Sequence, residues 1–351
     1  MERRAFLGLS AAAMAALGSG AALAGSDATL MGAVAKLADL LDTGYVIPAT
    51  GKRYAAMLRA KLAGGDYAAI ADADTLARRL TADLAAVAQD RHLRVVPEAS
   101  LPPGLRPAPA PAAGAGAGPS PAPGGPRPPQ RRAIEDAGWL APDIGYIRFT
   151  GFPEDPAVGV AAGAFMRDHA AARAIIIDSR YNGGGGIVQM NAMLPYLYAK
   201  ETTLVRMEMV AAVAKARGGS PFDGDAFVRP AAKTTPDIIA SEHYVVPQKD
   251  ETRLFGAKVF YLVSGGTASA AEHLALAFKR TKRATLIGET TAGANHFGGF
   301  EQIGAGLVVF LPVGRTVDPD TGKDWEADGI APDVAVAPTL ALEEAIKRAR
   351  A

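Results

Sequence analysis

A serine at the start of a predicted helix is the first residue whose type and position could do chemistry. Ser269 comes shortly after the apolar, strand-like run Lys258–Val263 and directly before the helix-forming run Ala270–Lys279. At a helix start, free backbone N–H groups and the helix dipole favour a developing oxyanion, and the N–H of Ala270 could donate to it. The spacing of Ser269 and Glu272 also fits a capping box, so local spacing leaves open whether Ser269 is a nucleophile or a helix cap.

A second candidate element is the segment Asp178–Gly186, which comes straight after the apolar run Ala174–Ile177 and ends in four glycines. In Gly183–Gly186 the absence of side chains would let backbone N–H groups point into a cavity. A flexible turn would have the same composition. The run is not a phosphate-binding loop and does not fit G-x-G-x-x-G, and no G-x-S-x-G elbow of an α/β-hydrolase is present in the chain.

A serine hydroxyl needs a base, and the candidates are the five histidines: His92, His169, His243, His273 and His296. His169 and His273 lie in polar helical stretches, and we expect them at the surface. His92 follows the N-terminal helical region. Glu326 is a carboxylate in a turn-rich segment, where it could equally be a solvated loop acid. Spacing alone does not join these residues in space.

The composition excludes several classes of chemistry. The chain has 351 residues, a formal net charge of +1 and no cysteine. Thiolate catalysis, disulfides and cysteine-based metal sites are therefore excluded. Because no H-E-x-x-H motif is present, we expect no catalytic metal and no cofactor. The charge balance gives no support for a nucleic-acid partner.

The N-terminus is typical of a secretory signal. The basic pair Arg3-Arg4 precedes the small, apolar run Gly8–Leu23, and Ala22-Leu23-Ala24 resembles a cleavage site. We interpret residues 1–24 as a twin-arginine-like signal peptide and expect an exported, periplasmic protein. An uncleaved membrane anchor is the alternative. No later run reaches the length of a membrane span, so we expect no stable span after cleavage.

The remaining chain divides by composition into three parts. Apolar residues at helical spacing between Thr29 and Ala88 predict a small helical N-terminal subdomain over 25–100. Residues 101–132 are rich in Pro, Ala and Gly and predict a linker. Residues 133–345 alternate strand and helix signals, which favours an α/β core with a largely parallel sheet. The expected core strands are Ile144–Phe149, Ala174–Ile177, Lys258–Val263, Ala284–Ile287 and Leu307–Leu311, and the helices are Ala161–Ala172, Ile187–Tyr198 and Ala270–Lys279.

Four ordered segments together resemble peptidase family S41, the tail-specific or C-terminal processing proteases. Within it the chain resembles the branch related to interphotoreceptor retinoid-binding protein modules. The segments are Ile175–Gly185, Gly266–Glu272, Leu286–Gly293 and Trp325–Val334. The resemblance implies a crotonase/ClpP-like α/β fold with Ser269 as nucleophile. It also implies an oxyanion hole made by the N–H groups of Ala270 and one glycine of the loop, Gly184.

Two departures from the family pattern narrow these expectations. The processing proteases carry a lysine base where this chain has Ala294, whereas the tricorn-like members use a Ser–His–Glu set. By that resemblance His92 is the base and Glu326 the orienting acid, and His296, close to the missing lysine, stays open as an alternative base. Many members also have a PDZ domain where this chain has its linker, so recognition of substrate C-termini is in doubt.

The function expected from the sequence is therefore hydrolysis of peptide bonds. We expect a serine endopeptidase that cleaves exported or unfolded proteins through an acyl-enzyme on Ser269. The alternative is a non-catalytic module that binds apolar ligands, as the resemblance to retinoid-binding modules allows. The presence of Ser269, His92 and Glu326 favours the peptidase. The oligomeric state does not follow from the sequence.

Overall fold

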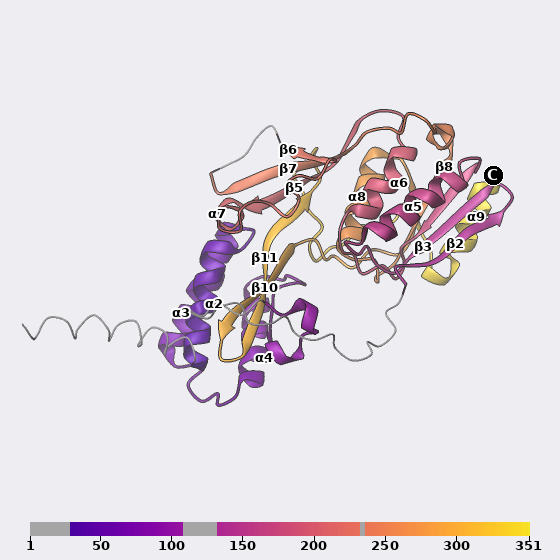
Figure 1. The fold of residues 1–351 in the computed structure, drawn as a ribbon. Coiled ribbons are helices and arrows are strands. Elements are labelled where there is room, and N and C mark those ends of the chain that lie inside the picture. The colour runs from indigo at the N-terminus through magenta and orange to yellow at the C-terminus, as the bar shows by residue number, and fades with distance from the viewer. Residues whose placement is uncertain (1–28, 108–131, 232–235) are drawn as a thin grey trace, which may run out of the picture. The chain divides into compact units, whose positions relative to one another are not determined.

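The computed structural model describes residues 29–107, 132–231 and 236–351 (Figure 1). The predicted signal peptide and most of the predicted linker lie outside these residues. The described chain forms two compact units. The first contains the residues up to Ala88, 93–107 and Gly299–Leu311. The second contains Gln89–His92, 132–298 and Pro312–Ala351, and it holds all the candidate site residues.

The first unit is built mainly from three helices, as the helical spacing predicted. They are α2 (Leu30–Gly44), α3 (Pro48–Gly64) and α4 (Ala73–Val87). Thr29 and Asp72 cap α2 and α4 with their side chains, and Gly65 ends α3 with a φ of 79°. Strand β1 (Arg94–Pro97) pairs antiparallel with the first residues of β11 (Leu307–Val317), and the short turns Glu98–Ser100 and Pro103–Leu105 follow it.

A buried carboxylate links two helices of this unit to the segment between them. Asp83 of α4 accepts hydrogen bonds from Lys61 at 2.6 Å and from the Tyr67 hydroxyl at 2.8 Å. Burial opposes ionisation of Asp83, but these bonds and one from Arg79 outweigh it and lower its pKa from the ordinary 3.8. The carboxylate therefore stabilises the unit in its charged form.

The second unit contains a six-stranded sheet in the order β12-β9-β8-β4-β3-β2. Its strands are β2 (Ile134–Ala141), β3 (Ile144–Phe149), β4 (Ala174–Asp178), β8 (Lys258–Val263), β9 (Thr285–Gly288) and β12 (Val334–Ala335). All neighbours are parallel except β2, which pairs antiparallel with β3 at the edge. The parallel core is confirmed.

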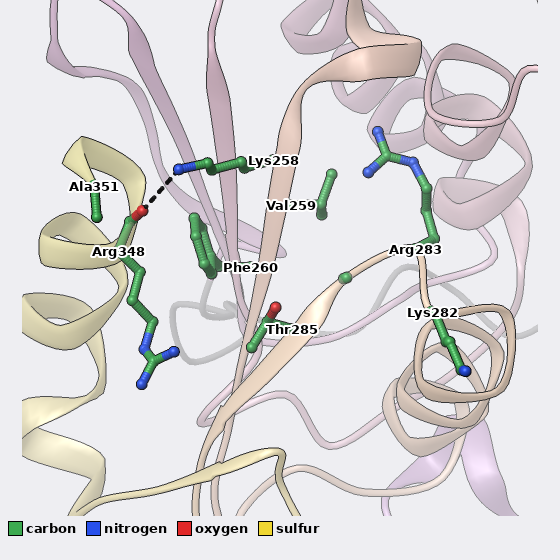
Figure 2. A pocket seen from close by; sticks show the side chains of 9 residues that line it. Lys258, Val259, Phe260, Lys282, Arg283, Thr285, Arg348 and Ala351 are labelled. Atoms are coloured by element: carbon green, nitrogen blue, oxygen red, sulfur yellow. Dashed lines mark hydrogen bonds between the residues drawn. The ribbon is translucent and has the colours of Figure 1, made fainter.

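The two ends of this sheet differ in chemistry. At the amino ends of β8 and β9, Figure 2 shows a pocket of about 440 Å³ with Lys258, Lys282, Arg283 and Arg348 around it. No histidine or acidic side chain lines this pocket. The carboxyl ends of β4 and β8 carry instead the glycine-rich and serine-containing loops, as is usual for ligand sites of parallel sheets.

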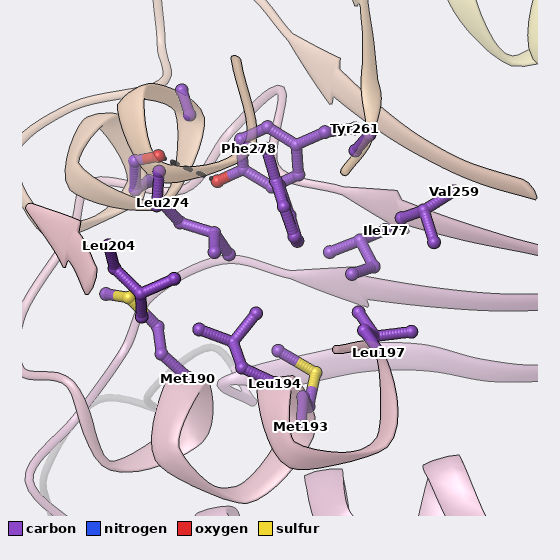
Figure 3. Close-up of a cluster of buried hydrophobic side chains, with 14 of the residues drawn as sticks. Ile177, Met190, Met193, Leu194, Leu197, Leu204, Val259, Tyr261, Leu274 and Phe278 are labelled. Carbon is purple, nitrogen blue, oxygen red and sulfur yellow. Dashed lines mark hydrogen bonds between the residues drawn. The ribbon is translucent and has the colours of Figure 1, made fainter. Parts of the chain in front are cut away.

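Helices cover both faces of the parallel sheet because successive strand residues point to opposite sides. Ile176 and its same-face neighbours contact the stripe Ala341, Ala345 and Ala349 of α9 (Ala341–Arg350). On the other face, Figure 3 shows Ile177 and Tyr261 facing side chains of two helices. These helices are α6 (Val188–Met193) and α8 (Ala270–Thr281), and α5 (Pro156–Asp168) contributes to the same buried cluster.

A second, antiparallel sheet was not predicted, so the expectation of one largely parallel sheet is incomplete. Its order is β1-β11-β5-β7-β6, and β10 pairs with β11. The added strands are β5 (Thr202–Val210), β6 (Val228–Pro230), β7 (Ile238–Val245) and β10 (Phe297–Gly304). In the second unit, residues Gly314–Val317 of β11 pair with β5, and β5 pairs with β7. Short helices Ala211–Ala216, Leu194–Tyr196, Arg253–Gly256 and Pro338–Leu340 connect the strands.

Some predicted boundaries are wrong by several residues. Helix α5 begins at Pro156 rather than at Ala161, because Asp155 caps it and proline suits the first helical position. The predicted helix Ile187–Tyr198 is the short helix α6 followed by a 3₁₀ turn. Within the described ranges, no helix combines the length and apolar character that a membrane crossing requires.

Candidate active site

Two loops meet at the carboxyl ends of the neighbouring strands β4 and β8. The Thr267 hydroxyl donates to the Ser179 carbonyl at 2.8 Å, and the Ala268 N–H donates to the Asn182 carbonyl at 3.0 Å. Asp178 pairs with Leu262 in the register of the two strands, so the two loops begin at the same edge of the sheet. The parallel pairing therefore places Ser269 beside the glycine run.

The backbone of Ser269 distinguishes between the nucleophile and the helix cap. Its φ of 53° and ψ of −120° differ from those of ordinary caps such as Asp155, which has a φ of −114°. Such a conformation costs a non-glycine residue roughly 1–3 kcal/mol and occurs mostly at functional sites. The Glu272 N–H lies 2.8 Å from the Ser269 carbonyl oxygen. The capping box with Glu272 is present, as the spacing predicted. Capping alone would not need the strained backbone, so the geometry favours a nucleophile at the capped helix start.

Glu272 is a structural centre of the site, although the sequence suggested only its capping role. The side chain is fully buried and accepts four hydrogen bonds. One comes from the Ser269 N–H at 2.9 Å. The others come from the Thr291 hydroxyl at 2.6 Å and from the N–H groups of Gly293 and Ala294 at 2.7 and 2.9 Å. Glu272 thus joins the helix start to the loop after β9.

Gly184 lies directly against the serine. Its φ is 92°, and a methyl group on its Cα would lie 2.7 Å from Ser269 Cβ and 2.9 Å from the Ala270 nitrogen. Only glycine therefore fits here. The Gly184 N–H donates to Asn182 Oδ1 at 2.9 Å. The Ala270 N–H makes no hydrogen bond to any described residue.

A cluster of two histidines and two carboxylates contains the predicted base and acid. His92 Nδ1 lies 4.0 Å from Glu326 Oε2, and His296 Nδ1 lies 3.9 Å from the same oxygen. Asp90 joins the histidines, because its Oδ1 accepts the His92 N–H at 2.8 Å and its Oδ2 lies 2.8 Å from His296 Nδ1. The structure therefore brings His92, Glu326 and His296 together.

Burial differs within this cluster. The His296 side chain is 2 % exposed and the Glu326 side chain 7 %, whereas the His92 side chain is 19 % exposed. Burial raises the pKa of Glu326, although the nearby His296 and hydrogen bonds from the Arg91 and His296 N–H groups oppose the rise. Glu326 is thus a held, buried carboxylate rather than a solvated loop acid.

A small cavity lies beside the serine and is lined by two chain neighbours of the cluster residues, Asn295 and Trp325. Its volume is about 40 Å³, and Ser269 and Ala270 line it together with Asn295 and Trp325. The Asn295 N–H donates to Glu326 Oε2 at 2.7 Å, and Trp325 precedes Glu326 in the chain. Within the described part of the chain, no hydrogen bond joins Ser269 to either histidine. Such bonds often tighten only when substrate is bound.

The prediction that His169 and His273 lie at the surface is wrong. His169 is 6 % exposed, with its ring stacked 4.2 Å from that of Phe165. His273 is 5 % exposed, and its Nε2 lies 2.8 Å from Nδ1 of His243. His273 lines the cavity beside Ser269, one helical turn further along α8. The burial of His273 could not be predicted from the sequence, because the strands that cover α8 were not predicted.

The carboxylate–histidine cluster is also the group whose spacing could hold a metal ion. Ligand atoms of Asp90, His296 and Glu326 all lie within 4.8 Å of one another. The same atoms, however, already have protein partners. Asp90 Oδ2 bonds His296 Nδ1, and Glu326 Oε2 accepts the N–H groups of Asn295 and His296. These oxygen and nitrogen atoms therefore already form a hydrogen-bonded network of carboxylates and imidazole.

With this geometry, the chain matches a known family over more than half its length. Peptidase family S41 matches residues 143–336, and the N-terminal domain of Peptidase_S41 in eukaryotic IRBP matches residues 13–122. The chain therefore belongs to peptidase family S41. It spans about half the length of several solved proteases that it matches.

The chain also matches solved structures at low sequence identity. A lipoprotein from Streptococcus agalactiae is 13 % identical with a TM-score of 0.52, and the match covers 92 % of this chain and 96 % of that chain. The photosystem II D1 C-terminal processing protease is 23 % identical with a TM-score of 0.40, covering 56 % of this chain and 43 % of that chain. Mature CPAF complexed with lactacystin is 16 % identical with a TM-score of 0.46, covering 59 % and 51 %.

Proposed function

We propose that this protein is an exported serine endopeptidase that cleaves exported or unfolded proteins through an acyl-enzyme on Ser269. The observation that carries the proposal is the strained backbone of Ser269 between Gly184 and the unbonded N–H of Ala270. A hydroxyl held there lies next to the donors that an oxyanion requires.

In this mechanism His92 removes the Ser269 proton while Ser269 Oγ attacks the carbonyl carbon of the substrate. Glu326 orients the imidazole and stabilises its charged form. His92 then gives the proton to the departing amine, and water hydrolyses the acyl-enzyme. The distance of 4.0 Å between His92 and Glu326 must shorten by about 1 Å to make a hydrogen bond.

The oxyanion hole is formed by the N–H groups of Ala270 and Gly184. The Ala270 N–H makes no hydrogen bond within the described chain, so it is ready to donate. The Gly184 N–H faces Asn182 Oδ1 and must exchange this partner for the oxyanion. The cost is small if the new acceptor is charged, because charge-assisted hydrogen bonds are the stronger ones.

His92 is favoured over His296 as the base by exposure. A base must meet both the serine and the leaving group, and His92 is the more exposed of the two rings. His296 is enclosed and bonded to Asp90, which suits a residue that positions the cluster.

The test is cleavage of β-casein, an unfolded protein, by wild type and by Ser269→Ala, His92→Ala and His296→Ala. We expect Ser269→Ala and His92→Ala to lose cleavage with unchanged thermal melts, and Ser269 alone to carry the label from a fluorophosphonate probe. Cleavage that survives in His92→Ala and disappears in His296→Ala would reverse the base assignment. Full cleavage by Ser269→Ala would refute the mechanism, and a protein that resists the probe but retains an apolar ligand would be a binding module.

Export is tested separately in cells. The basic pair Arg3-Arg4 and the apolar run after it support a twin-arginine route. We expect the N-terminus of the mature protein to follow Ala24, and expect the change of both arginines to lysine to leave the precursor in the cytoplasm. An unprocessed wild-type protein would contradict this part of the proposal.

A further inference from the structure

The cavity beside Ser269 receives the side chain of the substrate residue whose carbonyl is attacked. Ser269, Ala270 and Gly185 form one side of it. A carbonyl held by the oxyanion donors fixes the Cα next to it, so the side chain on that Cα must enter the adjoining space. The cavity of about 40 Å³ has room for about three water-sized groups, since a water needs roughly 10–15 Å³. Only a small side chain fits.

The walls are mostly apolar, but His273 brings an imidazole to them. Ile187, Phe222, Phe297 and Trp325 supply the apolar surface. His273 lies four residues after Ser269 on α8, which places both on one helix face. The mechanism above does not use this ring.

A chain of hydrogen bonds fixes which nitrogen of His273 carries the proton. Asn191 Nδ2 donates to both carboxylate oxygens of Asp225, at 3.2 and 3.0 Å. Because a carboxylate only accepts, the Asn191 carbonyl oxygen must face His243 Nε2, 2.8 Å away. His243 Nε2 is therefore protonated and donates to that oxygen. Its Nδ1 is then an acceptor, and the proton between the two rings belongs to His273 Nε2.

The remaining nitrogen, His273 Nδ1, is consequently an acceptor. It makes no hydrogen bond with the described residues, yet it is not among the enclosed atoms that lack a partner. The nitrogen is thus not fully enclosed, and His273 lines the cavity. Burial lowers the pKa of His273 to about 4, so the ring stays neutral near pH 7.

A donor in the same wall is also unused. The indole N–H of Trp325 is buried and has no hydrogen-bond partner among the described residues. Trp325 is 4 % exposed and lines the cavity. This nitrogen is enclosed, so Trp325 contributes apolar ring surface to the cavity rather than a hydrogen bond to a bound group.

We propose that His273 sets the specificity of this peptidase, and that the cavity takes serine or threonine on the acyl side of the cleaved bond. The substrate hydroxyl donates to His273 Nδ1. Larger donors such as tyrosine exceed the room available. This inference rests on the proposed peptidase function. Asp225, Asn191 and His243 are positioning residues, since they act only through the proton of His273.

The test uses internally quenched peptides that differ only in the residue before the cleaved bond. Threonine and valine have nearly the same shape, so their ratio of kcat/KM measures the hydroxyl alone. We expect the wild type to prefer threonine by about 10- to 100-fold, because valine leaves the buried acceptor unpaired. In His273→Leu the ratio should fall to near one.

Asp225→Asn gives a gentler second variant at a half-buried position. It lets the Asn191 amide turn over, so the tautomer is no longer fixed and the threonine preference should fall several-fold, whether or not His273→Leu folds. His169→Leu is the matched control, because it removes a buried histidine away from the cavity and should keep the wild-type ratio. A structural role alone would change the melting temperature but not this ratio.

A wild-type ratio of one or below would overturn the inference, and so would a ratio that Asp225→Asn leaves unchanged. These failures differ from failure of the proposed function. If the wild type cleaves no peptide and Ser269 does not react with a fluorophosphonate, the peptidase proposal itself is refuted. If both peptides are cleaved equally well, only the specificity assignment is wrong.

Discussion

Replacing Ser269 by glycine should make the protein more stable while abolishing its activity. The φ of 53° and ψ of −120° are unfavourable for serine but accessible to glycine. Relief of this strain contributes roughly 1–3 kcal/mol. The extra freedom of glycine in the unfolded chain costs roughly 0.5–1 kcal/mol. The two ranges combine to a change in the free energy of unfolding of about 0 to 2.5 kcal/mol, in the stabilising direction relative to wild type.

The sign of the change in the free energy of unfolding distinguishes a strained nucleophile from an ordinary helix cap. If Ser269 were an ordinary cap, glycine would lower the stability by a few tenths of a kcal/mol. Urea or thermal unfolding of the full chain measures the difference, with an expected rise in melting temperature on the order of 1 to 8 °C.

Asp155→Gly is the matched control, because Asp155 caps α5 in the same unit with an unstrained φ of −114° and a side-chain bond to the Ala157 N–H at 2.9 Å. It should lower the stability. If Ser269→Gly also melts below wild type, the backbone strain assigned to the nucleophile is refuted.

Three further changes follow from contacts described above. Gly184→Ala should reduce kcat/KM by about 10²–10³, because the new methyl group would lie 2.7 Å from Ser269 Cβ and displace the oxyanion donors; near-normal kinetics would show that this loop is not part of the site. Glu272→Gln should lower the free energy of unfolding by roughly 3 kcal/mol, since an amide cannot accept all four donors, and a melt equal to wild type would contradict this. Asp83→Asn should destabilise the first unit at pH 7. Because the folded pKa of Asp83 is lowered, its contribution is present above about pH 4 and is lost as the pH falls further, so the destabilisation in urea should shrink at acid pH; an effect independent of pH would refute it.

The parallel core could be predicted because its strands are short, fully apolar runs. Ala174–Asp178 and Lys258–Val263 are buried on both faces, and such runs leave little ambiguity. The antiparallel strands, such as Thr202–Val210, contain both polar and apolar residues. Which of their residues are buried depends on pairing with strands far away in the chain. They were therefore missed.

The same gap explains the errors at the histidines. Helix α8 is contacted by β5 as well as by the parallel sheet, so its first turns are buried almost all round. Polar residues in a helix predict a solvent-exposed face only when no other element packs against that face. The resemblance supplied Ser269, His92 and Glu326. The bond from the Ser269 N–H to Glu272 follows from the capping-box spacing. The strain at Ser269 and the three bonds from the loop after β9 depend on backbone geometry that no residue pattern encodes.

The hydrogen bonds of Glu272 determine at which stage of folding Ser269 can become reactive. Its carboxylate gathers the serine N–H and three donors from the loop after β9, so the nucleophile reaches its conformation only when both segments are in place. A nascent or partly unfolded chain lacks this arrangement and would carry an ordinary, unreactive serine. The reactivity of the serine is therefore coupled to folding of the second unit.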